Sequence, residues 1–311
     1  MLGNVLKQLV VALAKSARFH AARVLPHKEP KASVASSAPR ESIPKEQALD
    51  ALDAQAGLDA QYLRPHRWPS YREDAVPKEL SSDPLYQLWI GTSGGHKWTQ
   101  YFAVYRDVFG SLTSHPMRIL EIGVYKGSGL RLWRRYFSHP DTLVVGIDIE
   151  PICAQFDSPN EGIRVRIGSQ ADPKFLQSII EEFGPFDLII DDGSHRSSHM
   201  ITSFNCLFAD GLKESGIYFV EDLHANYWPA WRDTTRSFLD VCKELVEHMH
   251  AHYQRNPSKL FMVAKASHQS MAALEVPIIT TMIHEIRFFD SMVAIYKTRR
   301  QYIPHYLLGS E

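Results

Sequence analysis

The sequence of 311 residues contains few cysteines, which are Cys153, Cys206 and Cys242. None of them forms a Cys-x-x-Cys pair, so their spacing indicates neither a disulfide framework nor a zinc site. We expect buried free thiols and a cytoplasmic protein, because free thiols are typical of a reducing compartment. A basic excess is also missing, since 34 Lys and Arg residues stand against 35 Asp and Glu residues. This balance argues against a nucleic-acid partner.

Long hydrophobic runs are absent as well, since none reaches the about 20 residues that a transmembrane helix needs. Residues 1–26 nevertheless predict an amphipathic helix with basic residues away from its apolar face. Such a helix can lie on an anionic membrane surface, and it can equally pack on another subunit of a homo-oligomer. Residues 27–61 are rich in Ala, Ser, Pro and charge, and predict a flexible linker. The folded domain is therefore expected at 62–311.

From about Asp83 onward, predicted strands and helices alternate, which indicates a parallel sheet with helices on both faces. The predicted helices are 85–90, 98–109, 129–137, 174–183, 198–208 and 231–253. The predicted strands are 117–124, 143–149, 163–167, 186–190, 216–220, 285–289 and 292–297. The last two are joined by a tight turn at Asp290-Ser291, so the final strand must run antiparallel. The expected fold class is α/β, a Rossmann-like, seven-stranded, mostly parallel sheet with a C-terminal antiparallel hairpin strand.

A glycine-rich loop, EIGVYKGSG at 121–129, follows the first predicted strand and precedes a helix. Asp148 stands at the end of the second strand, about 20 residues farther on, where an acid binds ribose hydroxyls in doubly wound folds. The glycines do not follow the G-x-G-x-x-G order of dinucleotide enzymes, and Glu121 precedes them. A carboxylate there suits a ligand with an ammonium group, such as S-adenosylmethionine, better than a pyrophosphate. A nicotinamide-dependent dehydrogenase is the alternative.

Carboxylates follow two further predicted strands at the same edge of the sheet. The fourth strand ends in Asp191-Asp192-Gly193-Ser194-His195 and the fifth in Glu221-Asp222. Acids so close together repel unless a positive charge lies among them, and a hard divalent cation with oxygen ligands meets that need. Asp192, Glu221 and Asp222 therefore predict a metal site, with magnesium expected. Asp191 taken alone is better explained as an acid at a strand end.

His195 follows a Gly-Ser turn beside these acids. A histidine can accept a proton near neutral pH, and a cation makes a bound hydroxyl easier to ionise. We therefore predict that His195 is a general base. His199 and His224 are nearby but weaker alternatives, because a polar side chain at the surface needs no catalytic role.

These motifs resemble a known family. The strings are RILEIGV with KGSGLRLWRRYF, VVGIDI, GPFDLIIDDGSH, SGIYFVEDLHANYWP and EIRFFDSMVAIYK, and they lie in order between about Leu85 and Lys297. The segment resembles the metal-dependent sugar O-methyltransferases of macrolide biosynthesis. It is also similar to the rhamnosyl O-methyltransferases of tetracenomycin type and to the cephalosporin-hydroxylase-like group.

The resemblance implies S-adenosylmethionine and Mg²⁺ as cofactors. Asp192, Glu221 and Asp222 would hold the metal, and His195 would be the catalytic base. The expected cofactor-binding residues are Glu121, Gly123, Gly127, Ser128, Asp148, Gln170, Asp172 and Asp191. Asp172 is also explained as a helix cap.

The expected function is methylation of a hydroxyl on a sugar, a glycosylated metabolite or a glycolipid. Two alternatives stay open. One is a catechol-type O-methyltransferase in which Tyr227, Trp228 and Trp231 clamp an aromatic diol. The other is a non-catalytic S-adenosylmethionine-binding protein anchored by its first helix.

The chain departs from the family in three places. The loop after the first strand is short here, where the macrolide enzymes can carry an insertion. The Gly-Thr-Asp-Lys usual near the start of the domain appears here as GTSGGHKW at 91–98. The N-terminal auxiliary domain of the macrolide enzymes is replaced by the amphipathic helix and the linker. The identity of the acceptor and the oligomeric state are therefore not carried over from the family.

Overall fold

The computed structural model of the chain describes residues 63–66, 78–254 and 275–300. The described helices and strands belong to one compact unit, Arg72–Glu311. The helix expected at 1–26 and the linker expected at 27–61 lie outside the described residues, so both stay predictions. Within the described part, no helix combines the length and the apolar character needed to cross a membrane.

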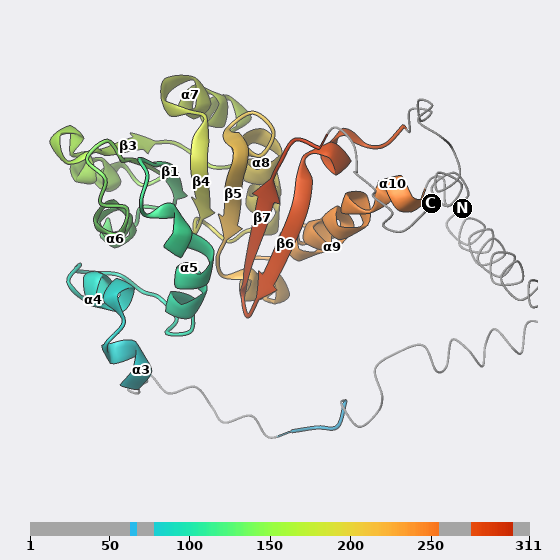
Figure 1. Ribbon diagram of the computed structural model, residues 1–311, viewed down its shortest axis with the longest axis horizontal. Helices are drawn as coiled ribbons and strands as arrows, with labels where there is room; N and C mark the ends of the chain where they lie inside the picture. Colours follow the sequence, from blue (N-terminus) through green and yellow to red (C-terminus); the bar gives the residue numbers. More distant parts are fainter. Residues whose placement is uncertain (1–62, 67–77, 255–274, 301–311) are drawn as a thin grey trace, which may run out of the picture. The chain divides into compact units, whose positions relative to one another are not determined.

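Seven strands form one sheet in the order β3-β2-β1-β4-β5-β7-β6 (Figure 1). The first five pair in parallel, and β7 lies antiparallel to both β5 and β6. The strands are β1 (Arg118–Ile122), β2 (Leu143–Asp148), β3 (Ile163–Ile167), β4 (Phe186–Asp191), β5 (Leu212–Val220), β6 (Ile283–Phe289) and β7 (Met292–Lys297). The predicted fold class is confirmed. Strand order reverses at β1, and open α/β sheets bind ligands beside such a switch point.

Helices cover both faces of the sheet (Figure 1). They are α3 (Lys78–Ser81), α4 (Pro84–Ile90), α5 (Tyr101–Phe109), α6 (Ser128–Tyr136), α7 (Pro173–Phe183), α8 (Ser197–Leu207), α9 (Phe238–Met249) and α10 (Ala251–Gln254). One hydrophobic cluster joins α4, α5 and α6 to one face. A second cluster joins α7, α8 and α9 to the other. Successive side chains of β1 point to opposite faces of the sheet, as in any strand, so Ile119 lies in the first cluster and Leu120 in the second.

Aromatic packing fixes α5 against α6. The fully buried Trp133 ring meets Tyr105 edge-on at a centroid distance of 5.1 Å and Phe109 at 5.7 Å. Edge-to-face contacts of this kind add about 0.5–1.5 kcal/mol each beyond the burial of area. The segment that precedes α5 is therefore held at a defined place relative to the glycine-rich loop, which precedes α6.

Three predicted elements need correction. The helix expected at 231–253 begins only at Phe238, because Ser237 and Asp240 form a reciprocal capping box there. The helix expected from 98 begins at Tyr101. The fifth strand starts at Leu212 rather than at 216.

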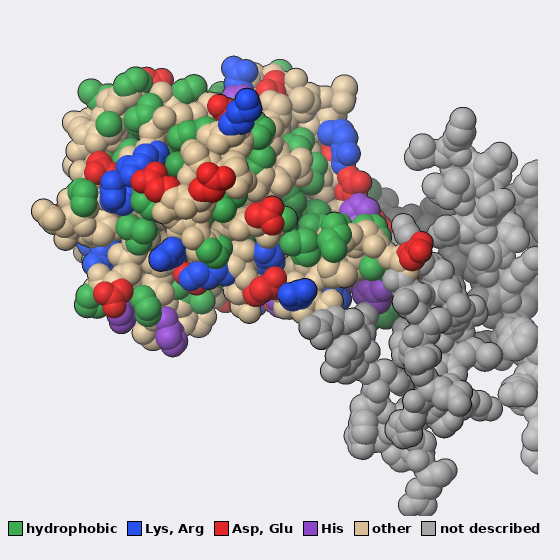
Figure 2. Space-filling model, turned by 90° about the horizontal axis from the view of Figure 1, so that it is seen from above, with side chains coloured by type: hydrophobic (Ala, Val, Ile, Leu, Met, Phe, Trp, Pro, Cys, Tyr) green, Lys and Arg blue, Asp and Glu red, His purple; other side chains and the backbone are tan. Residues whose placement is uncertain are grey.

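The surface carries mixed charge. On the face shown in Figure 2, acidic and basic side chains lie beside one another, interspersed with hydrophobic ones. That face therefore lacks the broad basic stripe by which proteins neutralise phosphates. All three cysteines are free thiols; Cys153 and Cys242 are buried, and Cys206 is partly exposed.

Candidate functional site

The carboxyl ends of β1, β2 and β4 border a cavity of about 520 Å³. Gly123, Asp148 and Gln170 line it, together with residues 192–194 from the loop after β4. A volume of this size lies within the range of small-molecule sites. Three of the predicted cofactor residues thus surround one space.

Asp148 is organised by the backbone of the glycine-rich loop. Its Oδ2 accepts N–H groups from Val124 at 2.8 Å and Tyr125 at 2.9 Å, and its Oδ1 accepts the N–H of Glu150 at 2.9 Å. Burial alone would raise the pKa of Asp148, but these N–H groups lower it below its usual value. The wall of the cavity therefore contains an ionised carboxylate that can accept hydrogen bonds from a ligand diol.

Gly123 lets the glycine-rich loop approach the loop after β4. Its φ is +96°, and a Cβ there would lie 2.2 Å from the backbone oxygen of Asp192. Every L side chain is therefore excluded at this position. The cofactor loop and the loop after β4 consequently touch through backbone alone, which brings the cavity and the acidic group together.

Glu121 lies under the loop and is 1% exposed. Its Oε1 accepts the Trp133 indole N–H at 2.8 Å, while Oε2 has no hydrogen-bond partner among the described residues. Burial raises the pKa of Glu121 to about 8. A neighbouring cation would stabilise the ionised form of this carboxylate, as the sequence predicts for a ligand ammonium.

Gln170 and Asp191 form a buried network behind the cavity. Gln170 donates to Asp191 Oδ1 at 3.1 Å and accepts the Ser194 N–H at 2.7 Å. Tyr218 donates its hydroxyl to Asp191 Oδ2 at 3.0 Å. Burial raises the pKa of Asp191 to about 6. The network holds the turn that carries His195, so Asp191 supports the site from behind, and a direct cofactor contact from it stays a prediction.

The remaining predicted cofactor residues sit at helix starts. Gly127, with φ of +70°, and Ser128 open α6, and Ser128 is buried. Asp172 accepts the Lys174 N–H at 2.9 Å and caps α7, which is the structural role that its position before a proline predicted. A contact between Asp172 and the cofactor also stays a prediction.

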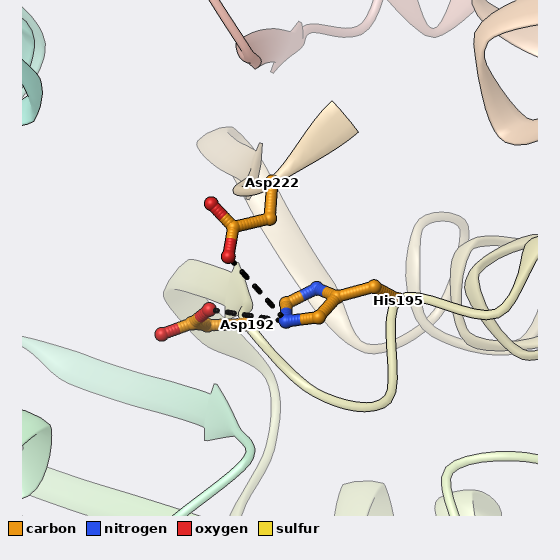
Figure 3. Close-up of side chains that lie close together, drawn as sticks. All are labelled: Asp192, His195 and Asp222. Carbon is orange, nitrogen blue, oxygen red and sulfur yellow. Dashed lines mark ion pairs between the residues drawn. The ribbon is translucent and has the colours of Figure 1, made fainter. Parts of the chain in front are cut away.

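Asp192, His195 and Asp222 converge beside the cavity (Figure 3). The His195 Nε2 lies 3.8 Å from Asp192 Oδ1 and 3.6 Å from Asp222 Oδ2. One ligand atom from each residue lies within 4.8 Å of the others, which is close enough to hold one ion. His195 and Asp222 both have φ of 55°, a left-handed backbone that non-glycine residues adopt rarely and chiefly at functional sites.

Lys97 is a residue of the site that the sequence reasoning missed. Its ammonium lies 2.5 Å from Asp192 Oδ2 and 2.6 Å from Glu221 Oε2, and the side chain is 6% exposed. Burial alone would lower the pKa of Lys97, but the two carboxylates raise it above its usual value. The only signal in the sequence was the unusual GTSGGHKW segment, in which Lys97 lies.

The donor set fits a hard divalent ion. Three acids, Asp192, Glu221 and Asp222, lie together, but the Lys97 ammonium contacts only Asp192 and Glu221, so the group keeps an excess of negative charge. Burial and, after it, the negative charge of Asp192 raise the pKa of Glu221 to about 8. Glu221 Oε1 is buried without a hydrogen-bond partner among the described residues. A second cation would satisfy this oxygen and keep all three acids ionised.

An aromatic row begins at the acidic group and runs to the surface. The His224 ring lies 5.7 Å from Trp98 and 4.6 Å from Trp228, and Trp228 lies 5.4 Å from Trp231. Trp228 is 45% exposed and Trp231 is 36% exposed. Backbone hydrogen bonds between Trp231 and Trp228, and between Ser197 and Trp231, fix the turn. We call Trp98, His224, Trp228 and Trp231 the aromatic row.

Comparison with known proteins gives several sugar O-methyltransferases among the relatives. An 8-demethyl-8-alpha-L-rhamnosyl tetracenomycin-C 2'-O-methyltransferase of Streptomyces olivaceus is 34% identical over 194 residues, which are 58% of this chain and 49% of that protein. An L-olivosyl-oleandolide 3-O-methyltransferase of Streptomyces antibioticus is 36% identical over 181 residues, 53% of this chain and 44% of the relative. The chain thus spans about half the length of these relatives. No family model matches it.

Among solved structures, the MycE methyltransferase from the mycinamycin biosynthetic pathway, in complex with Mg, SAH and mycinamycin VI, matches with a TM-score of 0.57 and 26% identity. The match covers 73% of this chain and 56% of MycE. The chain is a homologue of these sugar O-methyltransferases. The resemblance predicted from the motifs is confirmed, and the described domain has the class I methyltransferase fold.

In the methyltransferase fold of this domain, the structure brings together most of the residues predicted for the site. Asp148, Gly123 and Gln170 line the cavity, and Asp192, His195 and Asp222 converge next to it. Glu221 differs, because its Oε2 pairs with Lys97. Its share in an ion site therefore stays a prediction.

Proposed function

We propose that the chain is an S-adenosylmethionine-dependent O-methyltransferase that uses a divalent ion, magnesium, and methylates a hydroxyl of a sugar ring in a glycosylated small molecule or glycolipid. The observation that carries the proposal is the shared position of the Asp148 cavity and the Asp192–His195–Asp222 group at one edge of the sheet. The names of the relatives support the reaction, and MycE, solved with Mg and SAH, supports both cofactors.

The cofactor would supply an electrophilic methyl group on its sulfonium. Asp148 would accept hydrogen bonds from the ribose hydroxyls. The ammonium of the amino-acid end would stabilise the ionised form of Glu121, whose Oε2 has no hydrogen-bond partner among the described residues. Gly123, where no Cβ fits, keeps the glycine-rich loop close to the backbone of Asp192 and lines the cavity. These residues would place the methyl group toward the loop after β4, where the acceptor would be held.

Replacing Asp148 with alanine should weaken S-adenosylmethionine binding about tenfold or more, because hydrogen bonds to a charged group are worth about 1.5–3 kcal/mol each. Calorimetry measures the change, with Asp141→Ala, an exposed acid, as the control. An S-adenosylhomocysteine analogue without the ribose 2′-hydroxyl separates direct contact from loop disturbance. The native protein should bind this analogue more weakly than S-adenosylhomocysteine. The Asp148→Ala variant should bind the two ligands with nearly equal affinity, because the carboxylate that contacts the hydroxyl is already gone. Unchanged cofactor affinity would remove Asp148 from the site.

The ion held by the acids would neutralise charge and favour ionisation of the acceptor hydroxyl. His195 would take the hydroxyl proton at Nε2, the atom that faces Asp192 and Asp222. Tyr101 donates its hydroxyl to Asp222 Oδ1 at 2.5 Å, which fixes that carboxylate. The contribution of the chain is thus positioning, proton acceptance and fixed charge.

The aromatic row supports a ring-shaped acceptor. It starts next to Asp222, because His224 Nδ1 lies 3.9 Å from Asp222 Oδ1, and it ends in exposed indole faces. Flat aromatic faces pack against the apolar face of a sugar ring, and they pack equally on a phenyl ring. A catechol-type acceptor is therefore the second candidate, favoured by the same four rings.

Truncating Trp228 to alanine should raise the KM for the acceptor about tenfold and change kcat less, since the ring binds substrate away from the reacting oxygen. Phe288→Ala on β6, which removes an aromatic ring of equal exposure, is the matched control. Steady-state kinetics with the best acceptor measure both constants. A Trp228→Ala variant with native KM would remove the aromatic row from acceptor binding.

The proposal as a whole is tested with labelled S-adenosylmethionine and a panel of methyl glycosides, glycolipid fractions and catechols. We expect label in the glycoside or glycolipid products. Transfer to catechols alone would favour the second candidate. Cofactor binding in calorimetry without transfer to any acceptor or extract would favour the non-catalytic alternative.

A further inference from the structure

Lys97 occupies a position that a bound ion would also need. Its ammonium contacts Asp192 Oδ2 and Glu221 Oε2, and both acids belong to the proposed ion site. The residues are far apart in the chain, by 95 and 124 positions, so the contact exists only because of the fold. Lysine carries a compact point charge with three donors, which suits it to bridge two carboxylates.

The backbone that carries Lys97 is anchored on the other side, against α6. Arg131 donates to the Ser93 carbonyl at 3.2 Å, and Arg135 donates to the Gly91 carbonyl at 3.3 Å. Immediately after Lys97, Tyr101 begins α5 and binds Asp222. The segment is thus fixed at both ends, while the flexible stem of the lysine lets its ammonium move without a change in the backbone.

A second lysine–carboxylate contact, made by Lys213, differs from that of Lys97 in position and burial. Lys213 also binds a carboxylate, Asp187, at 2.8 and 2.9 Å, but at the amino end of β5 and with a side chain that is 37% exposed. Lys97 lies at the opposite, carboxyl end, buried among the acids that line the site. A surface pair such as Lys213–Asp187 is screened by water, whereas the Lys97 charge acts at short range in a medium of low dielectric.

We propose that Lys97 is an internal counter-ion that competes with the divalent ion for Asp192 and Glu221. Without an ion, its ammonium offsets part of the negative charge of the two carboxylates and keeps the acidic edge folded. When an ion binds, the ammonium leaves these oxygens. Lys97 therefore sets the affinity of the site for the ion and the stability of the ion-free protein. The inference rests on the ion site of the proposed function.

Titration with Mn²⁺, followed by the loss of the electron paramagnetic resonance signal of the free ion, tests this competition without an acceptor. Lys97→Met keeps the length of the side chain and removes its charge. We expect it to bind Mn²⁺ about tenfold or more tightly than the native chain, because a nearby positive charge is gone. Lys213→Met, which removes a lysine from a carboxylate pair at the other end of β5, should leave Mn²⁺ affinity unchanged. Equal or weaker binding by Lys97→Met would overturn the proposal.

Thermal unfolding provides the second readout. Without ions, Lys97→Met should melt at a lower temperature than the native chain, because two buried carboxylates lose their partner. Mn²⁺ should raise its melting temperature by more than it raises that of the native chain. Lys97→Gln, which keeps a hydrogen-bond donor, serves if the methionine variant does not fold. A native crystal grown with Mn²⁺ should show the Lys97 ammonium away from Asp192; an ammonium still bound there, with the ion present, would contradict the competition.

The two proposals can fail separately. Tighter Mn²⁺ binding by Lys97→Met in a protein that transfers no methyl group would preserve the counter-ion and end the proposed reaction. Methyl transfer that needs magnesium, with no effect of Lys97→Met on Mn²⁺ affinity, would preserve the proposed reaction and end the counter-ion proposal.

Discussion

Replacing His195 with alanine is expected to lower the turnover of methyl transfer by roughly 10²–10⁴-fold, the range for loss of a general base. The affinities for S-adenosylmethionine and for the ion should stay close to native, since Asp148 and the acids are unchanged. Turnover should recover in part at high pH, where the acceptor hydroxyl loses its proton without help. Single-turnover assays measure the rate, and calorimetry measures both affinities.

Two neighbouring histidines provide the controls for this prediction. His199 binds Ser194 Oγ through Nδ1 at 2.8 Å, and His224 binds Ser291 Oγ at 2.5 Å. Neither contacts both Asp192 and Asp222, so alanine at either position should cost less turnover than at His195. Normal turnover in His195→Ala would refute its role as base. Loss of ion binding in that variant would make His195 a ligand of the ion, which its distances to the two acids also allow.

The sheet and the acidic edge follow from patterns that are local in the sequence. The strand that ends in Asp191 reads as a short apolar run, and the Asp290-Ser291 turn marks the hairpin, in which Ser291 adopts φ of 67°. Because parallel strands place their carboxyl ends at one edge, strand order alone brings Asp192 and Asp222 close together. These predictions needed no knowledge of side-chain packing.

Two of the features that were not predicted correctly are the start of α9, where two local sequence patterns compete, and the position of Lys97, which depends on contacts between residues far apart in the sequence. The predicted helix began at Trp231, yet the chain is not helical at residues 231–236, and Ser237 with Asp240 starts the helix later. The Ser-x-x-Asp capping box was visible in the sequence and could have set this boundary. Lys97 could not be placed, because no local pattern shows that a lysine will meet acids 95 and 124 residues away.

Removal of the divalent ion is expected to have an effect at least as large as the loss of His195. Asp222→Asn should lower transfer by about a hundredfold or more, because an ion contributes several kcal/mol of charge stabilisation. Asparagine tolerates the left-handed backbone of this residue and still accepts the Tyr101 hydroxyl, so the fold should persist. Excess magnesium should restore part of the activity if the variant only weakens ion binding.

The most direct test of the account is a paired measurement on one preparation of the native protein. Methyl transfer and S-adenosylmethionine affinity are both determined in EDTA, and again after magnesium is added in excess. In the proposed function, Asp148 and Glu121 would bind the cofactor without needing the ion, whereas binding of the acceptor would depend on the acids at 192, 221 and 222. The account predicts that EDTA abolishes transfer, that magnesium restores it, and that cofactor affinity is the same in both conditions. Transfer that continues unchanged in EDTA would contradict it.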